Sequence, residues 1–457
     1  MQQYSVKEYI KTVCEQIRWK KAHASISKEI EDHIIDQKRA FLNSGLDDKT
    51  AAEKAIMEMG DPVMIGTELD RTYRPKMECG ILVLTFVLVL TGFLIRCFMI
   101  YNDVAPLFND ILSIIIGFAF MLAAYFWDFT SIGKHPKKIF FGLTILLFAL
   151  FVMSPYSYYM SFNTLLLPIN FSFVFLLLPT AFTGIIYAMR SKGYLGIIQI
   201  GVIFSISAVI CLNQRSLSGV VIYSISCLLL LTMAILNGWF NVKKINALLI
   251  VYGAVALISL ILMYIIISTN SYIFYRIRAA FNPMFEPETS GWLINFVRSI
   301  IAGAKLFGQG SLGKYEEIPI PHKHSDLLLT YLIHELGWVF FAVIMTIIII
   351  FIIRLFIICK KQKSVLAKLV STSVLITFTM QFIVYVGYNL GFQLLSPFAL
   401  PFISYGGTST VINMTLVGIM LSVFNTGELY HDDKSKYSPS RNTLFEYTDG
   451  EGNKLEF

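Results

Sequence analysis

The chain has 457 residues, of which 56% are hydrophobic and only 15% are charged, and its mean hydropathy is +0.65. Soluble globular domains carry about 25% charged residues, so this composition excludes a soluble enzyme, a disordered chain and a secreted disulfide scaffold. The net charge of +7 is the excess of lysine and arginine that the cytoplasmic loops of a membrane protein are expected to carry. Six cysteines are scattered without a C-x-x-C pair, so neither zinc knuckles nor disulfide staples are indicated.

Residues 1–76 form a charged segment without any membrane-spanning run. Its capping and stop signals predict helices over 6–22 and 27–42, a third helix from Asp47 to Gly60, and a fourth that starts at Asp61-Pro62. No apolar core lies near the start, so no signal peptide is expected. We therefore expect a small helical domain on the cytoplasmic side.

Ten apolar runs follow, each close to the roughly 20 residues that a helix needs to cross a hydrocarbon core of about 30 Å. They lie at 79–101, 110–128, 139–155, 163–189, 194–212, 217–237, 245–268, 327–353, 366–390 and 403–424. Pro168 and Pro179 interrupt the fourth run. The sequence predicts an all-α polytopic membrane protein with ten transmembrane helices.

Alternate short loops carry the basic residues, as the positive-inside rule requires of cytoplasmic loops. The basic loops hold Lys134, Lys137 and Lys138; Arg190 and Lys192; Lys243 and Lys244; and Arg354, Lys360, Lys361 and Lys363. This pattern predicts that both termini, including a tail at 426–457, lie in the cytoplasm. It also places a long connection, residues 269–326, outside the cell, and long loops are disproportionately functional.

Asp326 ends this loop, directly before an apolar run, in the string His322-Lys-His-Ser-Asp326. A carboxylate at a helix start is commonly an N-cap. The H-x-H-x-D string also suggests a metal site, but Leu327 stands where a further histidine would be expected, and Trp338 breaks a zincin pattern after His334-Glu335. Capping and chemistry therefore stay open for Asp326, and a zinc site is disfavoured.

Several strings resemble the SEDS family of bacterial cell-wall synthases, typified by RodA, FtsW and SpoVE. They are Gly303-Ala-Lys-Leu-Phe-Gly-Gln-Gly-Ser-Leu-Gly313, Pro321-His-Lys-His-Ser-Asp326, His334-Glu-Leu-Gly337 and Leu400-Pro-Phe-Ile-Ser-Tyr-Gly-Gly-Thr-Ser409. The resemblance covers about residues 270–425, and the Leu-Pro-Phe-Ile-Ser-Tyr-Gly-Gly string is its most specific part. Residues 1–75 are similar to a helical prefix domain found ahead of some permease-like proteins.

The resemblance implies a peptidoglycan glycosyltransferase that polymerises lipid II, the undecaprenyl-pyrophosphate-linked disaccharide pentapeptide, at the outer face of the bacterial cytoplasmic membrane. It assigns the family's essential aspartate to Asp326, which can act as a general base on the acceptor hydroxyl. The expected substrate-binding residues are Arg276, Arg278, Lys305, Lys314, His324, Ser325, Glu335 and Arg96. A divalent cation (Mg or Mn) could assist the pyrophosphate leaving group, and a class B penicillin-binding protein is the expected partner.

Some positions depart from the family pattern. The family's acidic residue before a middle span aligns with Ser216, a Glu-Glu pair is His334-Glu335, and the usual Thr-Gly before the most specific string is Ser396-Pro397. Arg96, near the outer end of the first span, is either functional or a cation that snorkels to the interface. A transporter of a lipid-linked precursor and a non-catalytic scaffold therefore remain the alternatives.

Overall fold

A computed structural model describes residues 5–20, 23–73, 78–102, 107–159, 171–212, 217–269, 272–316 and 318–427 of the chain. The first helices in these residues are α1 (Val6–Gln16), α2 (His23–Asn43), α3 (Asp48–Met59) and α4 (Pro62–Tyr73). The four helices expected before the first span are confirmed. Helix α1 ends at Gln16 rather than at residue 22, because the backbone of Ile17 turns to an extended conformation.

Helices α1 to α4 pack around a small core of their own. Its buried members are Tyr9, Val13, Ile17, Ile26, Ile30, Ile34 and Ala55. A capping box starts α1, in which the Ser5 hydroxyl accepts from the Glu8 N–H and the Glu8 carboxylate accepts from the Ser5 N–H. The Tyr9 hydroxyl donates to the carbonyl of Gly60 over 3.2 Å, so α1 is tied to the α3–α4 turn. The cytoplasmic location of this domain stays a prediction.

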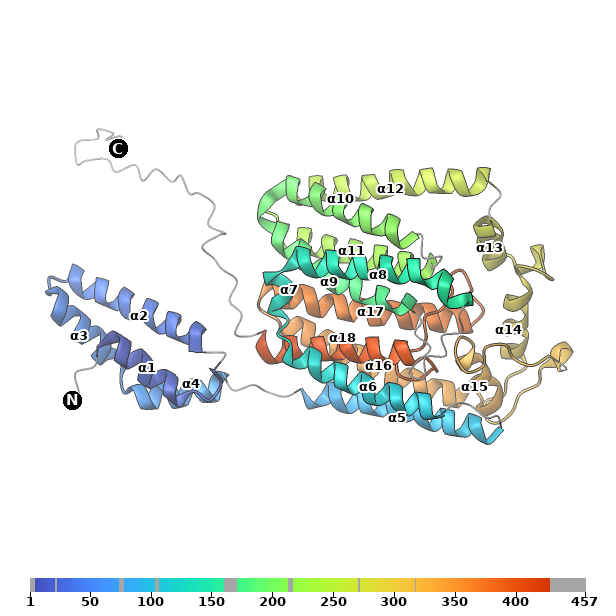
Figure 1. Cartoon of the computed structure of the whole chain (residues 1–457), viewed down its shortest axis with the longest axis horizontal. Coiled ribbons are helices and arrows are strands. Elements are labelled where there is room, and N and C mark those ends of the chain that lie inside the picture. Colours follow the sequence, from blue (N-terminus) through green and yellow to red (C-terminus); the bar gives the residue numbers. More distant parts are fainter. Residues whose placement is uncertain are drawn as a thin grey trace.

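The remaining helices include a bundle of long, roughly parallel and antiparallel segments (Figure 1). They are α5 (Cys79–Asn102), α6 (Leu107–Phe126), α7 (Thr130–Lys134), α8 (Pro136–Tyr159), η2 (Phe171–Leu177), α9 (Leu178–Met189), η3 (Arg190–Lys192), α10 (Gly193–Leu212), α11 (Leu217–Leu236), α12 (Lys244–Ser268), α13 (Tyr272–Phe281), η4 (Pro283–Phe285), α14 (Trp292–Ala302), η5 (Gly313–Tyr315), α15 (Leu328–Leu336), α16 (Trp338–Lys361), α17 (Val365–Asn389) and α18 (Gly407–Thr426).

Seven apolar helical segments within the described residues are long enough to cross a membrane. They are Cys79–Met99, Phe173–Ile210, Ser218–Leu236, Lys244–Ser268, Trp338–Lys361, Val365–Asn389 and Gly407–Thr426. The second of these contains both α9 and α10, which are separated by η3. Helix α10 begins at Gly193, whose φ is +59°. The chain is therefore an all-helical polytopic membrane protein.

The described part of the fourth predicted span, residues 171–189, is the 3₁₀ helix η2 followed by the short α9. Two further predicted spans also differ from the observed helices. The run 327–353 is broken into α15 and α16 at Gly337, whose φ of +93° no continuous helix can contain. The last run begins at Gly407 rather than at 403, because residues 401–406 form an irregular segment that includes Phe402 at a φ of +67°. Residues 163–170 of the fourth run, Ser216 and the tail from 428 onward lie outside the described residues.

Helices α17 and α18 form the centre of the bundle, and 67% of the spanning window of α18 is buried, against 6% for α12. The side chains of α12 are therefore exposed along most of its length. Helix α18 packs closely on α6, where a Cβ added to Gly117 would meet the sulfur of Met414 at 2.7 Å. Glycines at such crossings let two helices in a membrane approach closely. This pairing fixes α6, and its Asp110, against the start of α18.

The long loop between α12 and α15 covers one end of the bundle, opposite the end beside α1–α4 (Figure 1). Helix α14 buries Ile294, Phe296, Val297 and Ile300, and Phe296 stacks on Trp292 with ring centroids 5.2 Å apart. The apolar stretch of this loop runs from residue 292 to residue 306. The structure forms the amphipathic helix α14 over most of that stretch and leaves residues 304–306 in an irregular loop.

Candidate active site

A tight turn places Asp326 directly before α15. His322 has a φ of +48°, and its carbonyl accepts from the N–H of Ser325 at 3.0 Å and of Leu327 at 3.2 Å. Helix α15 starts at Leu328, and its N-cap residue, Leu327, has no side-chain capping bond. Asp326 is therefore not the N-cap residue that its position before the apolar run suggests.

Asn389, at the end of α17, provides the missing cap. Its Oδ1 accepts from the N–H of Thr330 at 3.0 Å, and its Nδ2 donates to the carbonyl of Asp326 at 2.9 Å. The Thr330 hydroxyl donates to the Asn389 side chain and carbonyl, each at 3.0 Å. Asn389 and Thr330 are fully buried. The capping function at this helix start thus belongs to a residue 59 positions away from Thr330 in the chain.

Two further contacts hold the backbone of the Asp326 turn. The buried Tyr385 hydroxyl of α17 donates to the carbonyl of Ser325, and the N–H of Tyr405 donates to the carbonyl of His324 at 3.0 Å. The carbonyls of residues 324, 325 and 326 are therefore each bound by a donor from α17 or from the loop before α18. The backbone of the turn is thus fixed by contacts from two neighbouring segments.

The carboxyl group of Asp326 is half-buried, and it lies outside the candidate membrane spans. Burial raises the pKa of this carboxyl above its ordinary value of 3.8, while the nearby His322 and a hydrogen bond from Ser325 oppose the rise. A carboxylate with a raised pKa binds a proton more readily, so Asp326 is a stronger base than a solvated aspartate.

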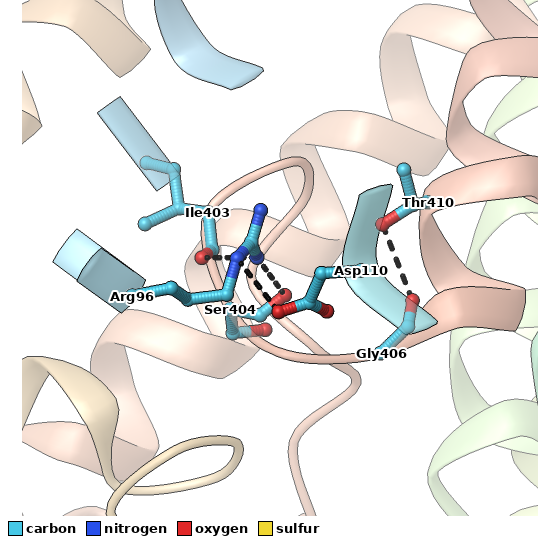
Figure 2. Close-up of polar contacts among 6 residues, drawn as sticks. All are labelled: Arg96, Asp110, Ile403, Ser404, Gly406 and Thr410. Atoms are coloured by element: carbon cyan, nitrogen blue, oxygen red, sulfur yellow. Dashed lines mark hydrogen bonds and ion pairs between the residues drawn. The ribbon is translucent and has the colours of Figure 1, made fainter. Parts of the chain in front are cut away.

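Arg96 and Asp110 form a buried ion pair beside the loop that precedes α18. The Arg96 Nε lies 3.2 Å from the Asp110 Oδ2, and the two side chains are only 8% and 5% exposed. The Arg96 Nη1 donates to the carbonyls of Ile403 at 3.2 Å and Ser404 at 3.4 Å (Figure 2). Arg96 therefore does not snorkel to the membrane surface.

The glycine-rich segment 303–313 wraps around the break between α15 and α16. Four backbone hydrogen bonds join the two: Gly308 N–H to the Leu336 carbonyl, Gly310 N–H to that of His334, Trp338 N–H to that of Lys305, and Val339 N–H to that of Leu306. The Lys305 side chain is exposed. Gln309 donates to the Glu335 carboxylate over 3.5 Å, so Glu335 lies at the end of a short helix and not within a continuous span.

The two arginines of α13 contact residues outside the Asp326 turn. The Arg276 Nη2 donates to the Ser396 hydroxyl at 2.9 Å, and the Arg278 guanidinium lies 3.3 Å from the centroid of the Phe285 ring. Arg278 is exposed, and Arg276 is half-exposed. The Lys314 side chain lies outside the described residues. Of the predicted site residues, the structure thus joins His324, Ser325 and Asp326 in one turn, and it places Arg276, Arg278 and Lys305 on neighbouring segments of the same end.

Three residues around the turn were missed by sequence reasoning: Asn389, Tyr385 and Asp110. Asn389 and Tyr385 gave no local signal, because their contacts reach about 60 residues back along the chain. Asp110 did give a signal. It is an acidic residue near the outer end of one apolar run, and Arg96 lies near the outer end of the preceding run. Two opposite charges at the same depth in neighbouring spans are expected to pair.

A family model described as "Cell cycle protein" (FtsW, RodA and SpoVE) matches residues 76–428. The "Probable peptidoglycan glycosyltransferase FtsW" of Trichlorobacter lovleyi is 29% identical over 155 residues, which cover 34% of this chain and 41% of that protein. The protein of the same name from Nitrosomonas europaea is 23% identical over 240 residues, covering 52% and 59%. The chain thus matches about half the length of these relatives.

Two solved structures share the fold. A chain from a peptidoglycan synthase complex, studied for its coordination of polymerization and crosslinking, superposes with a TM-score of 0.59 at 17% identity and covers 78% of this chain and 99% of that chain. The rod shape determining protein RodA of Thermus thermophilus superposes with a TM-score of 0.50 at 13% identity and covers 78% and 98%. The fold is RodA-like, the predicted resemblance is confirmed, and the chain belongs to the FtsW/RodA/SpoVE family of cell cycle proteins.

Proposed function

We propose that this protein is a peptidoglycan glycosyltransferase that polymerises lipid II at the outer face of the bacterial cytoplasmic membrane. Family membership and relatives named as probable peptidoglycan glycosyltransferases support this activity. The observation that carries the proposal is the Asp326 turn. Its backbone is held by Asn389, Tyr385 and Tyr405, whereas its carboxylate has no capping role and a raised pKa.

Asp326 is the general base in this proposal. Its carboxylate takes the proton of the acceptor 4-hydroxyl as that oxygen attacks the anomeric carbon of the donor sugar. The new glycosidic C–O bond forms while the bond from the anomeric carbon to the lipid pyrophosphate breaks, and the pyrophosphate leaves with the bonding electrons. His324 and Ser325, on the same turn, are the proposed contacts to the sugar or the pyrophosphate.

The basic residues of the outer loop would stabilise the negative charge that develops on the leaving pyrophosphate. The proposed contacts are Arg276, Arg278, Lys305 and Lys314, and Glu335 is proposed as a further contact to the substrate. Arg276 is held by Ser396, and Lys305 is held through its backbone at the start of α16. The Arg276 side chain and the Lys305 backbone therefore have defined positions, while the exposed Lys305 side chain can reach a substrate.

A divalent cation could assist the same leaving group. Across the described parts of the chain, no three His, Cys, Asp or Glu side chains lie close enough to hold a metal ion. Mg²⁺ is commonly bound through one or two carboxylates together with substrate phosphates. Glu335 is the predicted site residue that fits this arrangement while Asp326 stays free to act as the base, and the cation would neutralise the pyrophosphate and would arrive with the substrate.

We also propose a class B penicillin-binding protein as the partner. The solved structure that superposes with a TM-score of 0.59 comes from a peptidoglycan synthase complex that combines polymerization with crosslinking. A polymerase of glycan strands needs a transpeptidase nearby, because uncrosslinked strands do not form a wall. The outer loop that carries Arg276 and α14 is the surface on which we expect such a partner to act.

The proposed membrane topology has ten spans with both termini in the cytoplasm. Helices α6 and α8 and the split of Phe173–Ile210 into α9 and α10 support the three spans beyond the seven clear segments. The basic loops support the orientation. The helical domain at 1–76 then lies in the cytoplasm, on the opposite side from Asp326, so we propose that it regulates or binds a partner and takes no part in the chemistry.

Polymerisation of purified lipid II by the detergent-solubilised full chain, with and without a candidate penicillin-binding protein, tests the function. We expect glycan strands from the wild-type protein and a rate at least about 10²-fold lower from Asp326→Asn, because the amide cannot accept the proton. Equal rates for the two proteins would contradict the general-base assignment. A wild-type protein that transports a lipid-linked precursor without making strands would favour the transporter, and one that does neither would favour the scaffold.

A further inference from the structure

We propose that the buried Arg96–Asp110 ion pair is a positioning device that holds the loop 400–406 and, through it, the turn that carries Asp326. This inference rests on the proposed function for its catalytic consequence. It replaces the substrate-binding role expected for Arg96 with an indirect role, in which the guanidinium acts on backbone carbonyls of its own chain.

The geometry of Arg96 fits a clamp better than a substrate ligand. One edge of the guanidinium faces Asp110, and Nη1 donates to the carbonyls of Ile403 and Ser404 (Figure 2). A planar guanidinium can contact a carboxylate and carbonyls at once, which a lysine ammonium cannot do with the same geometry. With 8% of its side chain exposed, Arg96 could reach a substrate only by giving up these contacts.

The loop that Arg96 holds needs an external restraint. Phe402 has a φ of +67°, a conformation that is unfavourable for a bulky residue and persists only where the surroundings impose it. Its ring is buried against Phe351 and Phe378. One turn before Arg96, Gly92 passes so close to the loop that an added Cβ would overlap the carbonyl oxygen of Phe402. Helix α5 thus presses on the loop and binds its carbonyls.

The loop then reaches the Asp326 turn directly. Tyr405, the residue after Ser404, donates its N–H to the carbonyl of His324 at 3.0 Å. On the other side, the Thr410 hydroxyl donates to the carbonyl of Gly406 at 3.2 Å, which ties the loop to the first turn of α18 (Figure 2). The loop is therefore held by α5 and α18, and it presents one backbone donor to the turn that carries the proposed base.

Asp110 completes the device by neutralising the arginine. An unpaired buried charge is costly, and removing one partner of a buried pair leaves the other uncompensated. Because Asp110 lies on α6, which packs closely on α18, the ion pair also ties α5 to the α6–α18 unit. The pair thus sets the position of the loop relative to three helices.

Hydrogen–deuterium exchange on the full chain in detergent tests the positioning without requiring activity. In Arg96→Gln, we expect the amides of 400–406 and 322–327 to exchange at least about tenfold faster, because hydrogen bonds from a charged donor are lost. Asp110→Asn retains the bonds of Arg96 to the loop and should give a smaller increase in the same two segments. It also keeps the test decisive if Arg96→Gln does not fold.

Arg354→Gln is the matched control. Arg354 is another arginine within an apolar helix, and its guanidinium lies beside Gly80 at the start of α5, so its loss should leave exchange in 400–406 and 322–327 unchanged. Unchanged exchange in both segments for Arg96→Gln and Asp110→Asn would overturn the proposal. An equal increase along the whole chain would also overturn it, since this outcome indicates general destabilisation.

The kinetic consequence separates positioning from substrate binding. For Arg96→Gln, we expect the kcat for lipid II polymerisation to fall about tenfold or more with KM within about twofold of the wild-type value, because substrate contacts are retained while the base is misplaced. A raised KM with an unchanged kcat would assign Arg96 to substrate binding instead. If the wild-type protein makes no glycan, the proposed function fails, while the exchange experiment still decides whether the clamp exists.

Discussion

The start of α15 depends on a single side chain from another helix. Asn389 accepts from the Thr330 N–H and donates to the Asp326 carbonyl, and it is fully buried. The amide of asparagine serves this dual role because it carries both a donor and an acceptor. Structural and chemical roles are thus divided between Asn389 and Asp326, although both lie at one helix start.

This division predicts unequal effects on stability. Asn389→Ala should lower the free energy of unfolding by about 1–3 kcal/mol, since a buried N–H and a carbonyl lose their partner. Asp326→Asn should lower it by less than about 0.5 kcal/mol. Unfolding in detergent, followed by loss of helical circular dichroism, measures both. If Asp326→Asn proved as destabilising as Asn389→Ala, the carboxylate would have a structural role that the backbone contacts do not explain.

The raised pKa of Asp326 predicts a pH dependence of activity. A general base must be ionised, so polymerisation should rise with pH through the pKa of Asp326, and the midpoint of this rise should lie above the ordinary carboxyl value of 3.8. His322 lowers that pKa by its positive charge. Removing the charge therefore moves the pKa of Asp326, and the midpoint, further up.

His322→Asn is the suitable variant, because asparagine tolerates the φ of +48° at this position. We expect the acid limb of kcat/KM against pH to shift to higher pH, with the rate above neutrality unchanged. A Lys323→Gln variant, next in sequence, controls for the loss of positive charge from the loop. A shift to lower pH in His322→Asn would contradict the electrostatic role of His322.

At the scale of elements, the break between α15 and α16 organises the outer loop. Gly337 ends α15 with a φ of +93°, and the segment 305–310 pairs with the backbone on both sides of the break. A continuous helix would bury its own carbonyls in the helical ladder. The break exposes carbonyls that accept from the N–H groups of Gly308 and Gly310. It also exposes the N–H groups of Trp338 and Val339, which donate to carbonyls of the glycine-rich segment.

Gly337→Ala should therefore be strongly destabilising. A left-handed conformation costs a non-glycine residue about 1–2 kcal/mol, and the added Cβ would also overlap the Leu306 carbonyl. We expect the free energy of unfolding to fall by at least about 2 kcal/mol, with proteolysis appearing within 303–313. Gly387→Ala on α17, where a Cβ meets no atom within 4 Å, should be neutral or slightly stabilising. Equal effects of the two substitutions would refute the role of the break.

At the scale of the whole molecule, the two ends of the bundle differ in composition. The helix α7 and the start of α12 lie at the end nearest α1–α4, whereas α13 and α14 lie at the opposite end (Figure 1). At the first of these ends, Lys134 is the last residue of α7 and Lys244 is the first residue of α12. The positive-inside rule counts the basic residues of short loops, such as those at the first end, so the end that carries the long loop 269–326 and Asp326 is expected to face outward.

Cysteine labelling tests this orientation. In a variant without the native cysteines, Glu288→Cys should react with a membrane-impermeant maleimide in intact cells, because residue 288 is exposed on the outer loop. Lys137→Cys, exposed near the start of α8, should react only after permeabilisation. The reverse pattern would invert the topology and remove the outward-facing site.

The sequence alone determined the helical membrane class, the four amino-terminal helices, most bundle helices and the family. These follow from local properties: apolar runs of spanning length, capping residues, and strings such as Leu400–Ser409. The sequence also indicated Asp326, His324 and Ser325 as candidate site residues, since they are close together in the chain.

Only the tertiary structure decided what holds that turn. The cap from Asn389, the carbonyl contacts of Tyr385 and Tyr405, and the clamp by Arg96 and Asp110 join residues from distant helices. Asp326 looked like a cap because capping is normally local, but here the donor and acceptor come from the end of α17. The physical reason is that a buried backbone group must find a partner wherever packing supplies one, and packing is a property of the whole bundle.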